Sequence, residues 1–217
     1  MNNNKNKSFV YISDEKKFIF VRVPKTASSS ILSNVSKFLN PKYSNFILDR
    51  NKTIGGIRKH ISAKVIKNHF PGQWDKCFTF GFVRNPYQQC VSAYYHFINS
   101  EATSYPDHID VSKLESIDKF IFYVLEDKPE WCHWLMQEKM LFDEKGNQLV
   151  DFIGRFESLQ KDYIRICDTI GIKHKILNHK NKRNIYHHNV SDILTDSVKS
   201  LISSKMSDTF KLLGYSK

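Results

Sequence analysis

The chain has 217 residues, the length of one α/β domain, and its hydrophobic and charged fractions of 41% and 25% are those of an ordinary globular protein. These values exclude a fibrous repeat and a disordered chain, so we expect a single domain over residues 1–217, with residues 1–8 as a flexible tail. The formal charge of +11 favours anionic partners: phosphates, acidic sugars, nucleic acid or an anionic membrane.

Cysteine spacing and hydropathy bear on metal binding, disulfide formation and cellular location. The four cysteines lie far apart without a CxxC pair, which argues against a zinc site and a disulfide scaffold. The polar start is not followed by the apolar run of a signal peptide, and no stretch of about 18 apolar residues occurs. We therefore expect reduced cysteines, no metal, no transmembrane segment and a cytoplasmic location. Because the basic residues form no pure Lys/Arg block, we also expect no nucleic acid partner.

The first predicted unit is a strand, a loop and a helix. Residues 17–23 are mostly aromatic and β-branched and end at Pro24, as a buried strand does. Residues 26–30 supply hydroxyls suited to a helix start, and apolar residues then recur at helical spacing until Asn40-Pro41. A less regular stretch follows, which predicts a loop and then a short helix at residues 62–68.

The same unit recurs twice along the chain. Residues 77–83 predict a second buried strand, and a helix over 87–98 follows Arg84-Asn85-Pro86. A third strand is predicted at 150–156. The remaining expected helices span residues 114–125, 159–170 and 193–213, with loops at 100–112 and 174–189.

Alternating strands and helices predict an α/β fold, a three-layer sandwich with a central parallel sheet. Ligands of such sheets bind at the carboxyl ends of the strands. Lys25 and Arg84 both follow a predicted strand, so we expect the two side chains at this edge of the sheet.

The loop after the first strand is suited to a tetrahedral anion. Backbone N–H groups at the helix start, the positive end of the helix dipole, several hydroxyls and the Lys25 ammonium all favour phosphate or sulfate. A plain helix cap beside a solvated lysine remains the structural alternative. A nucleoside triphosphate loop is disfavoured, because its glycine signature is missing: no glycine lies between Met1 and Thr53.

Arg84 and Ser92 form a second candidate anion site. Arg84 ends the second strand, and Ser92 lies eight positions later, two turns along the next helix. Two anion sites on neighbouring loops indicate a nucleotide with separated phosphate groups. No carboxylate pair stands at the strand ends to hold magnesium, which disfavours metal-assisted phosphoryl transfer.

With these motifs the chain resembles the carbohydrate sulfotransferases that use 3′-phosphoadenosine 5′-phosphosulfate (PAPS), particularly the branch with heparan uronosyl 2-O- and chondroitin sulfotransferases and bacterial relatives. The resemblance implies their P-loop-NTPase-like fold. It covers most of the chain and is carried by an ordered set of four blocks, at residues 23–30, 82–95, 152–157 and 210–215.

The resemblance implies a role for each matching residue. Lys25 neutralises the oxygen from which the sulfuryl group departs, and the following loop residues hold the 5′ end of the donor: Thr26, Ala27, Ser28, Ser29 and Ser30. Arg84 and Ser92 hold the 3′-phosphate, and Arg155 approaches the nucleotide. The implied product is adenosine 3′,5′-bisphosphate (PAP), with no metal required.

The acceptor hydroxyl needs a base, and in the family a histidine between the two nucleotide elements serves. His60 matches that block better than His69, which we keep as the reserve. The resemblance implies a saccharide acceptor, with a groove built from the variable loops at 43–59 and 100–112. Trp131, His133 and Trp134 suit a sugar ring but equally a core.

Two other functions remain open at this stage. A nucleotide or sugar kinase of the P-loop type would share the strand, loop and lysine. A non-catalytic module would use the same basic cleft to bind sulfated polysaccharide or nucleic acid. For the basic stretch at 180–183, within the loop at 174–189, three roles stay open: a cover over the nucleotide, a contact for an acidic acceptor, or a mobile basic loop.

Overall fold

A computed structural model of the chain describes residues 9–45, 60–98, 115–127, 136–177 and 190–217. Predictions that fall elsewhere lie outside the described residues. They are the tail at 1–8, Cys132, the three acceptor candidates at 131–134, the loop at 100–112, and most of the loops at 43–59 and 174–189.

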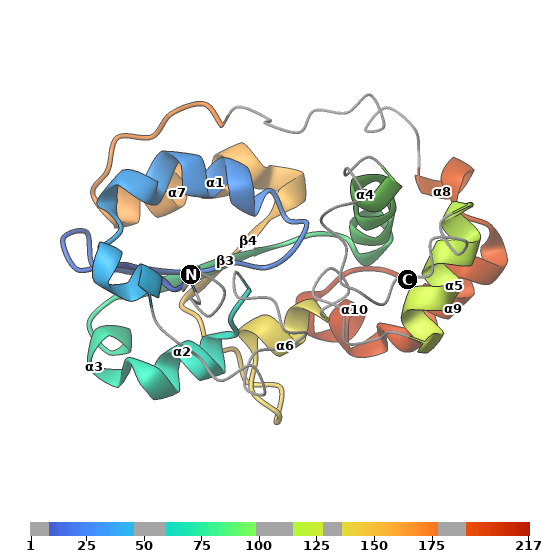
Figure 1. The fold of residues 1–217 in the computed structure, drawn as a ribbon, viewed down its shortest axis with the longest axis horizontal. Coiled ribbons are helices and arrows are strands. Elements are labelled where there is room, and N and C mark those ends of the chain that lie inside the picture. The colour runs from blue at the N-terminus through green and yellow to red at the C-terminus, as the bar shows by residue number, and fades with distance from the viewer. Residues whose placement is uncertain (1–8, 46–59, 99–114, 128–135, 178–189) are drawn as a thin grey trace, which may run out of the picture.

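A four-stranded sheet forms the centre of the fold (Figure 1). Its order is β1-β2-β3-β4, and the strands are β1 (Tyr11–Ser13), β2 (Phe18–Val21), β3 (Phe78–Val83) and β4 (Phe152–Arg155). β2, β3 and β4 are the three predicted strands, and they are parallel as expected. The prediction of a fully parallel sheet is wrong at β1, which pairs antiparallel with β2. β1 was not predicted, because its three residues are too few for an alternating pattern to emerge.

Helices cover both faces of the sheet, which confirms the predicted arrangement of a central sheet between helical layers. In Figure 1, α1 and α7 lie on one face and α2, α3 and α6 on the other, while α4, α5, α9 and α10 gather beside the carboxyl ends of the strands. The helices are α1 (Ser28–Val35), α2 (Ala63–His69), α3 (Pro71–Trp74), α4 (Pro86–Ile98), α5 (Ile117–Asp127), α6 (Gln137–Leu141), α7 (Leu159–Thr169), α8 (Val190–Ile193), α9 (Asp196–Lys205) and α10 (Ser207–Leu213).

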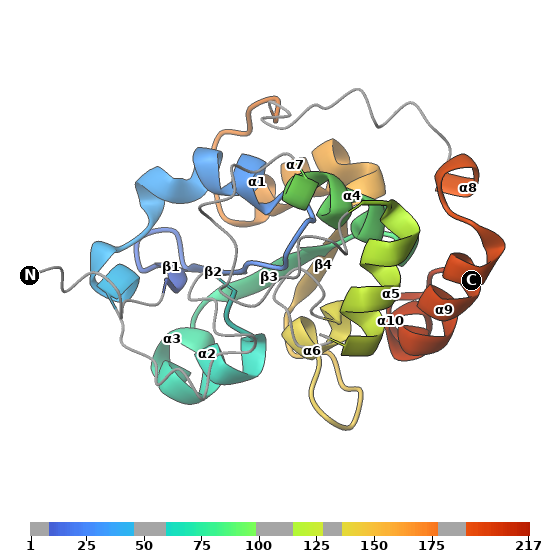
Figure 2. The ribbon, with the colours of Figure 1, turned by 45° about the vertical axis from the view of Figure 1, so that its right-hand side comes forward.

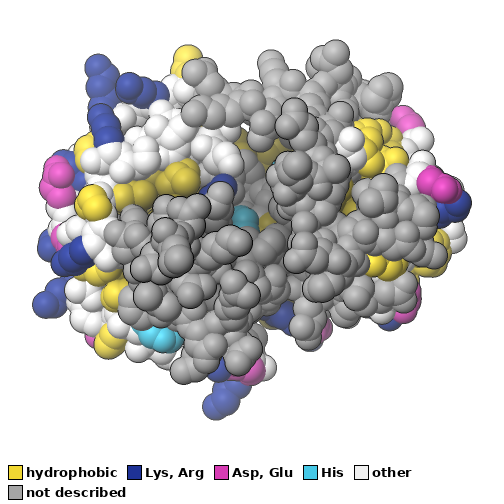
Figure 3. Space-filling view, viewed as in Figure 1, with side chains coloured by type: hydrophobic (Ala, Val, Ile, Leu, Met, Phe, Trp, Pro, Cys, Tyr) yellow, Lys and Arg dark blue, Asp and Glu magenta, His cyan; other side chains and the backbone are white. Residues whose placement is uncertain are grey.

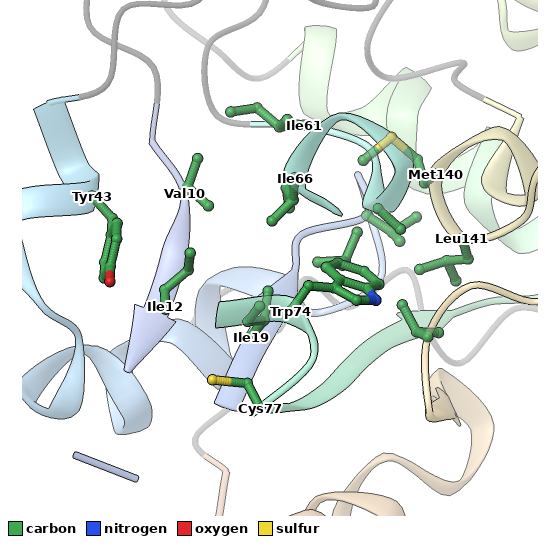
Figure 4. Close-up of a cluster of buried hydrophobic side chains, with 14 of the residues drawn as sticks. Val10, Ile12, Ile19, Tyr43, Ile61, Ile66, Trp74, Cys77, Met140 and Leu141 are labelled. Atoms are coloured by element: carbon green, nitrogen blue, oxygen red, sulfur yellow. The ribbon is translucent and has the colours of Figure 1, made fainter. Parts of the chain in front are cut away.

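Alternating side chains divide the sheet core into two halves. On one face, four buried phenylalanines pack against α1 and α7: Phe18, Phe20, Phe80 and Phe82. On the opposite face, Ile19 and Val21 pack against α2, α3 and α6 through residues such as Ile66, Trp74 and Leu141 (Figure 4). We name these two clusters the phenylalanine cluster and the tryptophan cluster.

A third cluster, the helical cluster, joins α4 and α5 to α9 and α10 away from the sheet. Figure 2 shows these helices side by side at one end of the molecule. Within the described ranges, every helix is too short or too polar to span a bilayer.

The single helix predicted over 193–213 is wrong. The structure has three helices here, and the chain bends at Met206, which has φ −107° and ψ 27°. The apolar spacing continues across the bend because Ile202, Met206 and Phe210 are all buried in the same helical cluster. Just before the bend, the Ser203 hydroxyl donates to the Lys199 carbonyl at 2.7 Å. Side-chain bonds of this kind to the helix backbone favour bending, and periodicity alone does not report them.

Gly154 allows β4 to approach a buried ring. A Cβ built at this position would lie 2.5 Å from the Phe82 ring, which is fully buried. We expect Gly154→Ala to destabilise the fold by about 2 kcal/mol, since a buried ring in the core cannot move aside freely. The measurement is the free energy of unfolding in urea. Gly72→Ala is the matched control, because a Cβ there meets nothing within 4 Å, and its stability should be unchanged or slightly higher. Equal losses in both variants would contradict the expectation.

Candidate functional site

The loops that follow β2, β3 and β4 open at one edge of the sheet. Val21 pairs with Gly81, and Val83 pairs with Arg155, so the three strands end nearly level. This places the loop around Lys25 beside Arg84, with Arg155 on the next strand. The backbone positions of Lys25 and Arg84 therefore lie at the carboxyl ends of neighbouring strands, as expected.

The loop after β2 is tightly curled although it contains no glycine. Lys25 and Ala27 adopt left-handed backbone conformations, with φ of 62° and 63°. Such conformations cost non-glycine residues about 1–2 kcal/mol each, and their presence at a candidate site is typical of a functional constraint. The buried Thr26 hydroxyl donates to the Val23 carbonyl at 3.1 Å, and the Gln89 amide of α4 donates to the Pro24 carbonyl at 3.2 Å. The loop is thus held from inside and from α4.

Arg22 is a further candidate site residue, which was not predicted from the sequence. Its guanidinium donates to the hydroxyls of Ser28 and Ser29, at 3.2 and 3.1 Å, and to the Tyr11 hydroxyl of β1 at 3.0 Å. Ser28 and Ser29 are two of the predicted donor-binding residues, so a second cation already lies against them. An arginine at the end of a buried strand, three positions before Lys25, was a signal that could have identified it.

His60 lies against the same segment, three residues before the start of α2. The side chain is 7% exposed, and its Nδ1 atom is 2.8 Å from the Arg22 carbonyl oxygen. Since a carbonyl can only accept, Nδ1 carries the proton in this contact, and the lone pair of the neutral ring is on Nε2. A histidine in this tautomer can take a proton at Nε2.

His69, the reserve candidate, is placed differently. It is exposed at the opposite end of α2, where its Nδ1 atom is 2.8 Å from the Val65 carbonyl oxygen of its own helix. In Figure 3, histidine and Lys/Arg atoms are visible near one another close to the middle of the face. The contact with Arg22 favours His60 over His69 as the candidate base.

Arg84 is nearly buried, at 4% exposure, and its backbone is fixed by Gln137 of α6. The Gln137 side chain accepts from the Arg84 N–H at 2.8 Å and donates to the Arg84 carbonyl at 2.7 Å. The Arg84 guanidinium lies over the Phe156 ring, 3.9 Å from its centroid, and Nε donates to Gln88 at 3.3 Å. The planar cation is thus held in one orientation by a ring and an amide.

Two further predicted site residues, Ser92 and Arg155, lie on α4 and β4. Ser92 is half-buried and lies four residues after Gln88, on the same face of α4. Arg155 is at the strand end as expected, but its guanidinium contacts the Leu213 carbonyl and the Tyr215 ring. Its approach to a nucleotide stays a prediction.

A depression of about 300 Å³ lies next to Arg84, at the start of α7. It is lined by residues 156–161 and Leu177, and so includes the Phe156 ring that Arg84 covers. Gln160 shapes its rim, since its amide is bonded to the Leu177 N–H at 2.8 Å. Within the part of the chain that the structure describes, His, Cys, Asp and Glu side chains do not gather in groups of three that can hold a metal.

Comparison with protein-family models matches residues 9–216 to the sulfotransferase family. The match includes every candidate site residue named above, from Arg22 to Arg155. A comparison with curated proteins gives no match.

Proposed function

Since the chain belongs to the sulfotransferase family, we propose that it transfers a sulfuryl group from PAPS to a hydroxyl of an acceptor, and that the acceptor is a carbohydrate. The observation that supports this most is the pairing of two anion sites on neighbouring strand ends, one at Lys25 and one at Arg84. Such a pair matches a nucleotide that carries charged groups at both its 5′ and 3′ positions. The proposal includes the P-loop-like character of the fold.

The 5′-phosphosulfate binds in the loop after β2. Backbone amides of the loop and the hydroxyls of residues 26–30 surround the anion, and Lys25 stabilises negative charge on the bridging oxygen as its bond to sulfur breaks. The Arg22 guanidinium, which already contacts the Ser28 and Ser29 hydroxyls, orients them and adds positive charge. The 3′-phosphate binds at Arg84 and Ser92, and the depression beside Phe156 adjoins the adenosine.

Transfer requires that one proton leave the acceptor. The acceptor oxygen forms a bond to sulfur on the side opposite the bridging oxygen, the old sulfur–oxygen bond breaks, and PAP departs. His60 takes the acceptor proton at Nε2, because Nδ1 is occupied by the Arg22 carbonyl. One residue, Arg22, therefore contacts both the donor loop and the base, which keeps the two at a constant separation.

The donor assignment is tested by thermal unfolding with different nucleotides. At a concentration of about 100 Kd, PAP should stabilise the fold by about 2.7 kcal/mol, which corresponds to roughly 5–10 °C for a chain of this length. Adenosine 5′-monophosphate, which lacks the 3′-phosphate, should stabilise it much less because it leaves Arg84 without a partner phosphate. Stabilisation by magnesium-ATP with none by PAP would instead favour a kinase.

The acceptor assignment is tested by a screen with radiolabelled sulfate donor over saccharides, small metabolites and tyrosine peptides. We expect label on a saccharide hydroxyl. Strongly salt-dependent polyanion binding without turnover on any acceptor would favour the non-catalytic module instead.

A further inference from the structure

The Glu157 carboxylate connects the loop between β3 and α4 to the turn that follows α10. One carboxylate oxygen, Oε1, accepts a hydrogen bond from the Asn85 N–H at 2.7 Å, and the other, Oε2, accepts from the Tyr215 hydroxyl at 2.9 Å. The two donors belong to segments that are far apart in sequence. The position of the Asn85 backbone therefore depends on where Tyr215 holds the carboxylate.

Tyr215 is itself fixed by the end of α10. Gly214 adopts a left-handed conformation with φ 64°, its N–H donates to the Lys211 carbonyl at 3.4 Å, and the Tyr215 N–H donates to the Phe210 carbonyl at 3.0 Å. These two bonds form a Schellman turn, which sets the direction of the residue that follows the helix.

The Tyr215 ring is held on two further sides. It packs against both the tryptophan cluster and the helical cluster, and the Arg155 guanidinium lies 4.6 Å from its centroid. Burial, together with the neighbouring Glu157 carboxylate, raises the pKa of Tyr215, so the hydroxyl keeps its proton and remains a donor. Few other positions of the hydroxyl are compatible with these contacts.

Asn85 is directly coupled to the candidate anion site. It follows Arg84, and its side-chain oxygen accepts from the N–H groups of Tyr87 and Gln88 at 3.0 and 3.3 Å, which caps the first turn of α4. Phe156, the ring under the Arg84 guanidinium, is adjacent to Glu157. Displacement of the Glu157 carboxylate would therefore loosen both the backbone next to Arg84 and the ring on which its charge rests.

We propose that Tyr215 is a positioning residue for the anion site at Arg84: through Glu157 it holds Asn85 and the start of α4 in the conformation that binds the 3′-phosphate. The proposal rests on the proposed function, because it assumes a phosphate at Arg84. Its physical basis is preorganisation. A site that populates the binding conformation only part of the time binds more weakly by that fraction.

Tyr215→Phe is the variant that isolates this role. It removes the hydroxyl but keeps the ring, its packing and the Arg155 contact, and it changes no charge at neutral pH. We expect the Kd for PAP, measured by calorimetry, to rise about 3–10-fold, as for a partly transmitted loss of a hydrogen bond to a charged group. The KM for the donor should rise similarly, while kcat at saturating donor stays unchanged.

Tyr43→Phe is the matched control. Its hydroxyl also donates to a carboxylate, that of Asp14, at 2.9 Å, but at the β1 edge of the sheet. This variant should lose a similar amount of thermal stability and bind PAP as the wild type does. Equal PAP affinity in Tyr215→Phe and the wild type would overturn the proposal, whatever the effect on stability.

A double-mutant cycle tests the route through Glu157. In a Glu157→Ala background, Tyr215→Phe should weaken PAP binding no further, because the acceptor of its hydrogen bond is already gone. The same additional loss in both backgrounds would overturn the role of Glu157. Wild-type protein with no affinity for PAP would overturn the proposed function and this proposal with it, and so differs from a failure of the positioning role alone.

Discussion

Lys25→Ala is expected to lower kcat for sulfuryl transfer by about 10²–10³-fold, the usual cost of removing one preorganised group that stabilises developing charge. The charge on the bridging oxygen grows as the sulfur–oxygen bond breaks, so the lysine contributes more in the transition state than in the bound donor. Alanine also has a Cβ, so the left-handed backbone at this position, with φ 62°, is strained to a similar degree in both proteins. The measurement is turnover of radiolabelled donor with the acceptor found in the screen.

Lys37→Ala is the control for this experiment. Lys37 is exposed just beyond the opposite end of α1 from the loop, where its ammonium lies over the Phe38 ring. Turnover by Lys37→Ala should equal that of the wild type, which would exclude a general effect of lost positive charge. A Lys25→Ala protein with wild-type kcat would contradict the assignment of Lys25 and weaken the proposed function.

His60→Asn is expected to lower kcat by about 10²–10⁴-fold, as for loss of a general base. Asparagine is chosen because its side-chain amide can still donate to the Arg22 carbonyl, as Nδ1 of His60 does at 2.8 Å. The contact between the β2 end and residue 60 is then kept while the basic Nε2 atom is lost. The Kd for PAP should stay near the wild-type value, since the bisphosphate has no acceptor proton to remove.

His69→Asn, at the last residue of α2, serves as the control. Its ring is exposed, and its Nδ1 atom lies 2.8 Å from a carbonyl oxygen of α2 rather than from the β2 segment that His60 contacts, so turnover should be unchanged. The opposite pattern, with His69→Asn inactive and His60→Asn active, would assign the base to the reserve candidate. Comparable activity in both variants and the wild type would place the base elsewhere.

Much of the fold was predictable because its elements depend on local patterns. The runs at 17–23, 77–83 and 150–156 each contain a strand, and the helix at 62–68 appears as α2, with Ser62 as its N-cap. The errors come from elements whose form depends on distant contacts. β1 is stabilised by pairing with β2, and the bend at Met206 lets α9 and α10 pack in one cluster.

The candidate site was predictable only in part, for the same reason. Lys25 and Arg84 follow predicted strands, Arg155 lies within one, and the sequence resemblance placed His60 between the two nucleotide elements. The residues that hold them were missed. Gln137 binds the Arg84 backbone from 53 positions away, and Glu157 binds Asn85 from 72 positions away.

By itself, the sequence determined that a lysine and hydroxyls follow one buried strand and that an arginine follows another. It could do so because the hydrophobic pattern of a strand or helix is visible in neighbouring residues. Only the tertiary structure decided how these groups are held. It brought Arg22 to the Ser28 and Ser29 hydroxyls, and it turned Arg155 toward the turn after α10. These hydrogen-bond partners depend on packing between segments that are distant in sequence, since a side chain bonds to the group that the folded chain places within reach.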